Sequence, residues 1–305
     1  MLVVVIWGWS FVWIKDALDA SSAILGAGHD AVSVGLFVGL RFGLAALLLP
    51  LFLPPARAIA ARPLWRGSFV LAALMGGGFF LQTFALVDIS PAVSAFLTSL
   101  YVAFTALLGR LLHHKRLGLA LAIGVACATL GGGFISGPPQ LHFDLPEWLS
   151  VGCALMFAGN ILATDHFTRR LPPLPLTTLS FLWVTLFSII ILLFGMTSAD
   201  APAWSLLGQL ILSPAYAWPL LLCTLLGTVF ALSAMNQFQR VLDPVRAAVL
   251  YGLEPVFTAI IAVSLGIEDL SFWLVFGGVA VFSGNIIAEL GPRVGQLAGY
   301  FQQQR

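Results

Sequence analysis

Long apolar runs separated by short polar connections dominate the sequence. Apolar runs of 17 or more residues, each ended by a charge, a proline or a glycine, occur ten times. A helix needs about 20 such residues to cross the hydrocarbon core of a bilayer, whereas a transmembrane strand alternates apolar and polar positions over about ten residues. The continuous runs therefore predict membrane-spanning helices near residues 1–17, 31–53, 67–87, 91–112, 117–136, 147–166, 174–196, 216–239, 244–266 and 270–290.

The first predicted helix, residues 1–17, is short for a membrane span. It opens at Met1 with no basic segment before the apolar run and no small-residue cleavage site after it. A secretory signal peptide has both a basic segment before its apolar run and a small-residue cleavage site after it. A signal peptide is therefore not expected, and two interpretations stay open: the true start of the chain lies upstream of Met1, or this helix begins at the membrane surface.

Composition excludes several other classes of protein. The chain of 305 residues is 60% hydrophobic and 9% charged, whereas a soluble domain has about 45–50% apolar and about 25% charged residues. A net charge of +1 predicts no nucleic-acid partner. The three cysteines lack CxxC spacing, and no glycine cluster has the GxxxxGK[ST] pattern of a phosphate loop, so we expect no metal, disulfide or cofactor.

The basic residues predict the orientation of the chain. If the N-terminus is cytoplasmic, twelve of the 14 basic residues fall on the cytoplasmic side, Lys15 alone falls outside, and Arg41 lies within a span. Basic residues concentrate on the cytoplasmic side of membrane proteins. The bias supports ten spans with cytoplasmic N- and C-termini.

The chain also repeats itself. Shifting the sequence by 153 residues aligns 90–134 with 243–287 without a gap, with 12 identical pairs among 45, including Phe104-Thr105-Ala106 against Phe257-Thr258-Ala259. A repeat unit of five helices is odd-numbered, so the second copy must enter the membrane from the opposite side. We predict an all-α integral membrane protein of two inverted five-helix repeats, residues 1–137 and 145–290, with a cytoplasmic tail at 291–305. Many secondary transporters have this architecture, with the substrate site near the midplane between the halves.

Several segments follow one another in an order and at a spacing typical of a known family. These segments are Trp7-Gly8-Trp9-Ser10-Phe11, Lys15, Leu40-Arg41-Phe42, Ser90 to Leu117, and Leu250 to Leu270 around Glu254-Pro255. Together they resemble the EamA family of the drug/metabolite transporter superfamily over nearly the whole chain. The resemblance implies a ten-helix carrier of a bacterial-type inner membrane, exporting amino acids or other small metabolites. The chain departs from the family at His113-His114-Lys115-Arg116, where members often have a Gly-Glu-Arg-like turn.

Two ionisable residues lie at mid-span. Arg41 and Glu254 are each ten residues inside a predicted helix, or about 15 Å deep at 1.5 Å per residue. Ionisable groups at this depth are costly and mark ion or substrate pathways. Glu254 is a candidate for proton coupling or cation binding, and Arg41 for a substrate carboxylate or for neutralising Glu254. The alternative is that both residues only fix packing, through helix carbonyls or each other.

Pro255 follows Glu254 directly and lacks a backbone donor, so it predicts a kink in the helix. Such a kink either shapes a cavity wall or acts as a gate. Other polar or aromatic residues within apolar runs are candidates for lining a substrate site, although interhelical hydrogen bonds are the alternative for each. For Trp7 an interfacial anchor is a further alternative. These candidates are Tyr251, Tyr101, Thr98, Asn236, Gln82, Asn160 and Trp7.

The leading hypothesis is a secondary active carrier that exports a small metabolite by alternating access, with a proton or cation as a possible coupling partner. A multidrug/amine or nucleotide-sugar-type carrier is the alternative substrate class. A channel is less well supported. An intramembrane enzyme is not expected, because no HExxH, GxSxG or aspartate pair lies at membrane depth.

Overall fold

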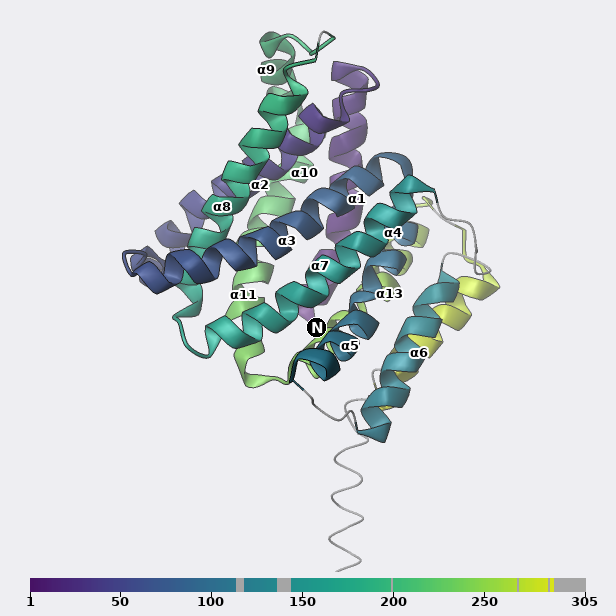
Figure 1. The fold of residues 1–305 in the computed structure, drawn as a ribbon. Coiled ribbons are helices and arrows are strands. Elements are labelled where there is room, and N and C mark those ends of the chain that lie inside the picture. The colour runs from purple at the N-terminus through teal and green to yellow at the C-terminus, as the bar shows by residue number, and fades with distance from the viewer. Residues whose placement is uncertain (114–117, 136–143, 199, 268, 285, 288–305) are drawn as a thin grey trace, which may run out of the picture.

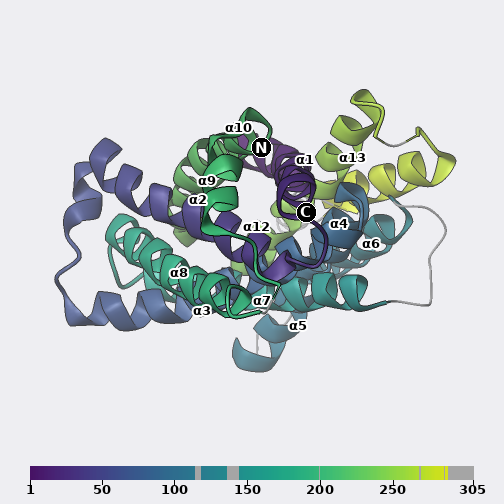
Figure 2. The same cartoon turned by 90° about the horizontal axis from the view of Figure 1, so that it is seen from above.

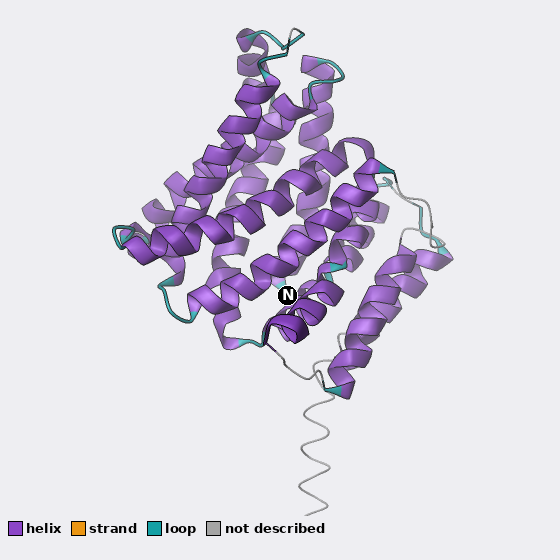
Figure 3. Cartoon of the chain, in the orientation of Figure 1, coloured by secondary structure: helices purple, strands orange, loops and turns teal. Residues whose placement is uncertain are grey.

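The computed structural model describes residues 1–113, 118–135, 144–198, 200–267, 269–284 and 286–287. Within these residues every regular element is a helix and none is a strand (Figure 3). The predicted tail at 291–305 and residues 114–117, which include His114, Lys115 and Arg116, lie outside the described residues. Seven helical segments are long and apolar enough to cross a membrane: Asp30–Phe52, Arg62–Asp88, Pro91–Leu112, Leu145–Thr168, Pro173–Gly195, Pro214–Val241 and Pro244–Ser264.

Helices also form at the three other predicted spans, but two of them are short. Apolar helices run through Ala122–Gly131 and Phe272–Gly284. Helix α1, Leu2–Leu25, has 24 residues and carries three charged side chains in its second half. The number of membrane-crossing helices among the described residues is thus seven by length and composition, and ten crossings stay a prediction.

The end of the first predicted helix was wrong. The apolar run stops at residue 17, yet α1 continues to Leu25. Lys15 Nζ donates hydrogen bonds to the backbone oxygens of Leu86, at 3.1 Å, and Val87, at 2.8 Å, and it pairs with Asp19 at 3.3 Å. Leu86 and Val87 are in the last turn of the helix that ends at Asp88, and a cation is favourable beside the free carbonyls at a helix C-terminus. The Lys15 ammonium is therefore stabilised within the protein, and the first helix continues past it.

The helices of each half follow in chain order (Figure 1). In the first half they are α1 (Leu2–Leu25), α2 (Asp30–Phe52), η1 (Pro54–Arg57), α3 (Arg62–Asp88), α4 (Pro91–Ser99), α5 (Tyr101–His113) and α6 (Leu119–Ile135). In the second half they are α7 (Leu145–Thr168), α8 (Pro173–Gly195), α9 (Trp204–Leu212), α10 (Pro214–Leu222), η2 (Cys223–Phe230), α11 (Ala231–Phe238), η3 (Gln239–Val241), α12 (Pro244–Tyr251) and α13 (Glu254–Ser264).

Two predicted spans are not continuous helices. Span 91–112 divides into α4 and α5 at Leu100, and span 244–266 divides into α12 and α13 at Gly252 and Leu253. The segment 216–239 contains a stretch of π-helix, η2. Helix α9 forms in a connection for which the apolar pattern predicts no helix. Breaks of this kind leave the hydrophobic content of a run unchanged, so an apolar pattern does not reveal them.

The two broken helices begin in the same way. Helix α4 starts with Pro91 in its first turn. The residue before it, Ser90, is the N-cap, and its Oγ accepts from the Val93 N–H at 3.3 Å. Helix α12 starts with Pro244, after Asp243 Oδ1 accepts from the Val245 N–H at 3.0 Å. An oxygen-bearing N-cap satisfies a free N–H, and proline has none to satisfy at this position. Equivalent positions of the sequence repeat therefore have equivalent local structure.

Packing between helices follows the repeat as well. Helix α2 lies along α8, the two helices occupying equivalent places in the two halves (Figures 1 and 2). Helix α1 packs on α13, and α7 correspondingly packs on α5. Helix α4 contacts α13 while α5 contacts α12, so the broken helices cross each other. At the edge of the molecule α6 packs against the helix at Phe272–Gly284, with Phe134 stacked on Trp273 at 5.6 Å.

The connections after α2 and after α7, both predicted to be cytoplasmic, lie side by side. An open pocket of about 510 Å³ separates the start of α3 from the end of α7. Basic side chains from the start of α3 and from the region where α7 ends line it, namely Arg62, Arg66, His166 and Arg170. The arrangement agrees with the alternation of sides that the basic residues predict.

Close approach of α2 and α8 depends on Gly35. A Cβ at this position would lie 2.6 Å from the backbone nitrogen of Leu192, which is closer than atoms can approach without a shift of the backbone. We predict that Gly35→Ala destabilises the protein by about 1–3 kcal/mol, because overpacking outweighs the higher helix propensity of alanine. Thermal unfolding of the detergent-solubilised protein measures this effect.

Gly208→Ala is the matched control, since a Cβ at Gly208 in α9 meets nothing within 4 Å. This control variant should unfold at the wild-type temperature or slightly above it. Equal unfolding temperatures for the two variants would contradict the close packing of α2 on α8.

Candidate functional site

Glu254 sits where the two broken helices cross. It begins α13 directly after the break at Gly252 and Leu253, and its counterpart in the first repeat, Tyr101, begins α5 after Leu100. The break at Gly252 and Leu253 comes before Pro255. This proline therefore occupies the first turn of α13, where a missing N–H costs no hydrogen bond. A Cβ at Gly252 would lie 2.9 Å from Val102 Cγ2, so the breaks are in close contact.

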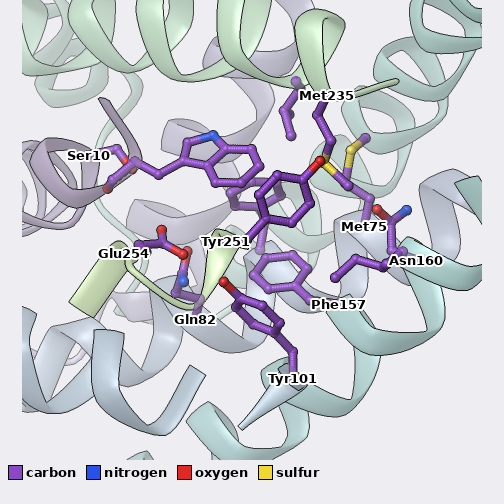
Figure 4. A pocket seen from close by; sticks show the side chains of 13 residues that line it. Ser10, Met75, Gln82, Tyr101, Phe157, Asn160, Met235, Tyr251 and Glu254 are labelled. Atoms are coloured by element: carbon purple, nitrogen blue, oxygen red, sulfur yellow. Dashed lines mark hydrogen bonds between the residues drawn. The ribbon is translucent and has the colours of Figure 1, made fainter. Parts of the chain in front are cut away.

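A cavity opens beside this crossing (Figure 4). Its volume is about 50 Å³, and a buried water occupies roughly 10–15 Å³ by this kind of measure. The cavity therefore holds a few water molecules but no metabolite in this conformation. Residues from both halves line it: Trp7, Ser10, Met75, Phe79, Gln82, Tyr101, Phe157, Asn160, Ile161, Leu232, Met235, Tyr251 and Glu254.

The polar end of the cavity is formed by Glu254, Tyr101 and Gln82. Their polar groups point toward one another (Figure 4). Glu254 is 8% exposed and has no ion pair with a basic side chain among the residues that the structure describes. Its backbone oxygen accepts from Thr258 Oγ1 at 3.0 Å. The carboxyl is thus shielded from lipid and directed into a small polar space.

Aromatic rings form the remaining walls. Trp7 packs edge-on against Tyr251 with ring centroids 5.4 Å apart, and its indole N–H donates to the Gly227 backbone oxygen at 3.3 Å. Phe79 packs edge-on against Phe157 at 5.2 Å. The indole hydrogen bond fixes Trp7 as part of the cavity wall, facing the protein interior.

The cavity brings together six of the nine sequence-predicted site residues. They are Glu254, Tyr251, Tyr101, Gln82, Asn160 and Trp7. Asn160 Nδ2 also donates to the Leu71 backbone oxygen at 3.3 Å, so its amide combines a helix-helix contact with the cavity wall.

The other three predicted residues do not line the cavity. Thr98 is buried with its Oγ1 3.9 Å from Cys153 Sγ. Asn236 Nδ2 donates to Thr177 Oγ1 at 2.8 Å, which joins α11 to α8. Thr98 and Tyr101 share a face only if the helix is continuous, and the break at Leu100 separates them. For Asn236 the observed contact is the interhelical hydrogen bond that was its alternative interpretation.

Arg41 lies apart from Glu254, next to η2. Its Nε–H donates to Thr228 Oγ1 at 2.6 Å, and Thr228 Oγ1 donates in turn to the Cys223 backbone oxygen at 3.0 Å. The guanidinium Cζ is 4.7 Å from the ring centroid of Phe79. Within the described residues Arg41 forms no ion pair, so the predicted contact with Glu254 does not occur in this conformation.

The sequence pattern missed the other lining residues, most of which are apolar. An apolar residue within an apolar run carries no distinguishing signal, and this applies to five of them. A weak signal exists for Met75, which precedes Gly76-Gly77-Gly78, and for Ser10, which belongs to the quoted Trp7 to Phe11 stretch. The missed residues are Ser10, Met75, Phe79, Phe157, Ile161, Leu232 and Met235.

Long apolar helices, two structurally equivalent halves and a cavity between them with one polar end are typical of integral membrane transporters. The chain belongs to the EamA-like transporter family, whose model matches residues 1–137 and again 145–289.

Similar proteins agree with this assignment. An uncharacterized transporter of Archaeoglobus fulgidus is 27% identical over 291 residues, which cover 95% of this chain and 84% of that protein. A solved crystal structure superposes with a TM-score of 0.67 at 16% identity, covering 95% of this chain and 97% of the other. At that identity the superposition shows a shared fold.

Two asparagines test the boundary of the site. Asn160 lines the cavity and Asn236 does not, although both were candidates from the sequence. We predict that Asn236→Ala lowers stability by about 0.5–2 kcal/mol through the lost interhelical hydrogen bond and leaves the KM for transport within about twofold of the wild type. Asn160→Ala should raise KM by about fivefold or more, because a lost hydrogen bond to substrate costs about 1 kcal/mol. Transport kinetics in proteoliposomes, with thermal unfolding alongside, measure both effects, and the reverse pattern of KM changes would contradict the site.

Proposed function

We propose that this protein is a secondary active carrier of the inner membrane that exports a small metabolite by alternating access, with Glu254 as the group that couples transport to a proton or cation. The observation that carries the proposal is the place of Glu254. It lies at the crossing of the two repeats, faces the cavity, and has no basic partner among the described residues. A carboxylate without a fixed counter-charge is available to a proton, a cation or a cationic substrate.

The chemistry of the cavity favours a substrate with a protonated amino group. Trp7, Tyr101 and Tyr251 offer ring faces or edges beside the carboxyl of Glu254, and aromatic rings with an acidic group suit ammonium ions. None of the described residues that line the cavity is basic. A nucleotide-sugar would bring phosphates that need basic partners, so amino acids and amines are the favoured classes.

The small volume of the cavity supports alternating access rather than a channel. A space for a few waters between two halves holds a metabolite only after one half moves relative to the other. The helix breaks at Leu100 and at Gly252 and Leu253 are the points where we propose that this movement occurs. The bias of the basic residues supports cytoplasmic termini. A channel would instead conduct current continuously across a reconstituted bilayer.

Glu254→Gln tests the coupling role. The amide is nearly the same size as the carboxyl, but it does not titrate near neutral pH and carries no charge that attracts a cation. We predict that a pH gradient accumulates substrate at least tenfold less in Glu254→Gln proteoliposomes, while exchange of labelled for unlabelled substrate continues. The substrate is first identified by screening labelled amino acids, amines and sugars, with and without a pH gradient.

Glu147→Gln is the matched control, because Glu147 belongs to the capping box at the exposed start of α7. This control variant should accumulate substrate as the wild type does. If Glu254→Gln accumulated substrate normally and with unchanged pH dependence, the coupling role would be wrong.

A further inference from the structure

Arg41 is a buried cation whose hydrogen-bonding capacity is only partly used. The residue is 1% exposed. Its Nε–H donates to Thr228 Oγ1, but Nη2 has no hydrogen-bond partner within the described part of the chain, and no acidic side chain described there pairs with it. A guanidinium has five N–H donors in a planar fork that matches a carboxylate.

The neighbours of Arg41 compensate for only part of this burial. The ring centroids of Phe79 and Phe42 lie 4.7 Å and 5.5 Å from Cζ, and both rings offer the guanidinium a cation–π interaction. Aromatic rings supply no hydrogen-bond acceptor for Nη2 and no net negative charge. Buried charges are ordinarily paired with an opposite charge. Within the described residues the buried guanidinium of Arg41 therefore has no anionic partner.

Arg41 lies directly behind the wall of the cavity on two sides. Phe79, which covers the guanidinium, also lines the cavity. On the other side Nη2 is 3.2 Å from the point where Gly227 would carry a Cβ, and that same point is 3.7 Å from Cβ of the cavity residue Ser10. Gly227 also accepts the indole hydrogen bond of Trp7. One phenyl ring and one glycine thus separate the cation from the cavity.

We propose that Arg41 is an anion-binding subsite of the transport cavity, uncovered when the Phe79 side chain rotates, and that the substrate is consequently a zwitterionic amino acid. Its carboxylate binds the Arg41 guanidinium, and its ammonium group lies toward Glu254 and the aromatic rings. This inference rests on the proposed carrier function and narrows its substrate class. An amine without a carboxylate occupies only the Glu254 end of the cavity.

The test compares each amino acid with the amine that lacks its carboxylate. Binding of a panel of labelled amino acids and their matching decarboxylated amines is measured to the full-length protein in lipid nanodiscs. The wild type should bind at least one amino acid about tenfold or more tightly than its amine, since hydrogen bonds to a charged group carry that much selectivity. Arg41→Gln should reduce this ratio to about one, with the affinity for the amine within about threefold of the wild type, and Arg41→Lys should restore part of it.

Arg169→Gln is the matched control, because Arg169 is exposed and paired with Asp165 outside the cavity. It should keep the wild-type ratio. A purely structural role of Arg41 would weaken the amino acid and the amine equally, which would overturn the subsite. A wild type that binds no amino acid more tightly than its amine would also overturn it.

Phe79→Leu keeps the inference testable if Arg41→Gln does not fold. Leucine retains apolar volume but removes the ring that covers the guanidinium. We expect amino acids to associate faster with Phe79→Leu than with the wild type, while the matching amines associate at an unchanged rate; equal acceleration of both would count against the subsite. These outcomes are separate from the coupling experiment with Glu254→Gln, so a carrier of amines alone would refute the Arg41 subsite and leave the proposed function standing.

Discussion

The crossing of two broken helices is the feature on which the site depends. In a hydrocarbon environment each backbone polar group must be satisfied within the protein, so a helix can break only where other protein segments cover it. Here each break is covered by the other: α4 contacts α13, α5 contacts α12, and Gly252 permits contact with Val102. The inverted repeat supplies two equivalent breaks, and their mutual burial makes a non-lipid interior at the centre of the molecule.

Two ionisable residues use this interior in different ways. Placing a charged residue at the centre of a membrane costs about 2.5–3.5 kcal/mol on insertion scales. Glu254 faces the cavity, with the polar groups of Tyr101 and Gln82 directed toward its carboxyl (Figure 4). Arg41 instead packs under Phe79 and donates to Thr228, which belongs to a π-helical stretch. Glu254 therefore faces the cavity in this conformation, whereas the Phe79 ring and Gly227 separate Arg41 from it.

Much of this arrangement is predictable from the sequence. Polar residues within apolar runs are rare, and cavities collect them, so Glu254, Tyr251 and Gln82 were found in this way. The repeat pairs the breaks correctly, because Leu100 and Leu253 occupy equivalent positions. Helical periodicity across a break is misleading: Thr98 and Tyr101 are three residues apart, yet only Tyr101 lines the cavity, because the break at Leu100 lies between them. The backbone oxygens that bind Lys15 lie about 70 residues away in the chain, so no local pattern predicts that α1 extends to Leu25. Likewise no pattern indicates that the Phe79 ring covers Arg41.

The most direct test of the central claim is the number of protons released when substrate binds. If Glu254 exchanges a proton for a substrate with an ammonium group, binding to the purified protein in weakly buffered solution should release up to about one proton per site, by linkage between the two binding reactions. A pH-indicator dye or calorimetry in buffers of different ionisation enthalpy measures this number. The account predicts proton release by the wild type and none by Glu254→Gln that still binds substrate. Equal release by both proteins would contradict the assignment of Glu254 as the coupling group.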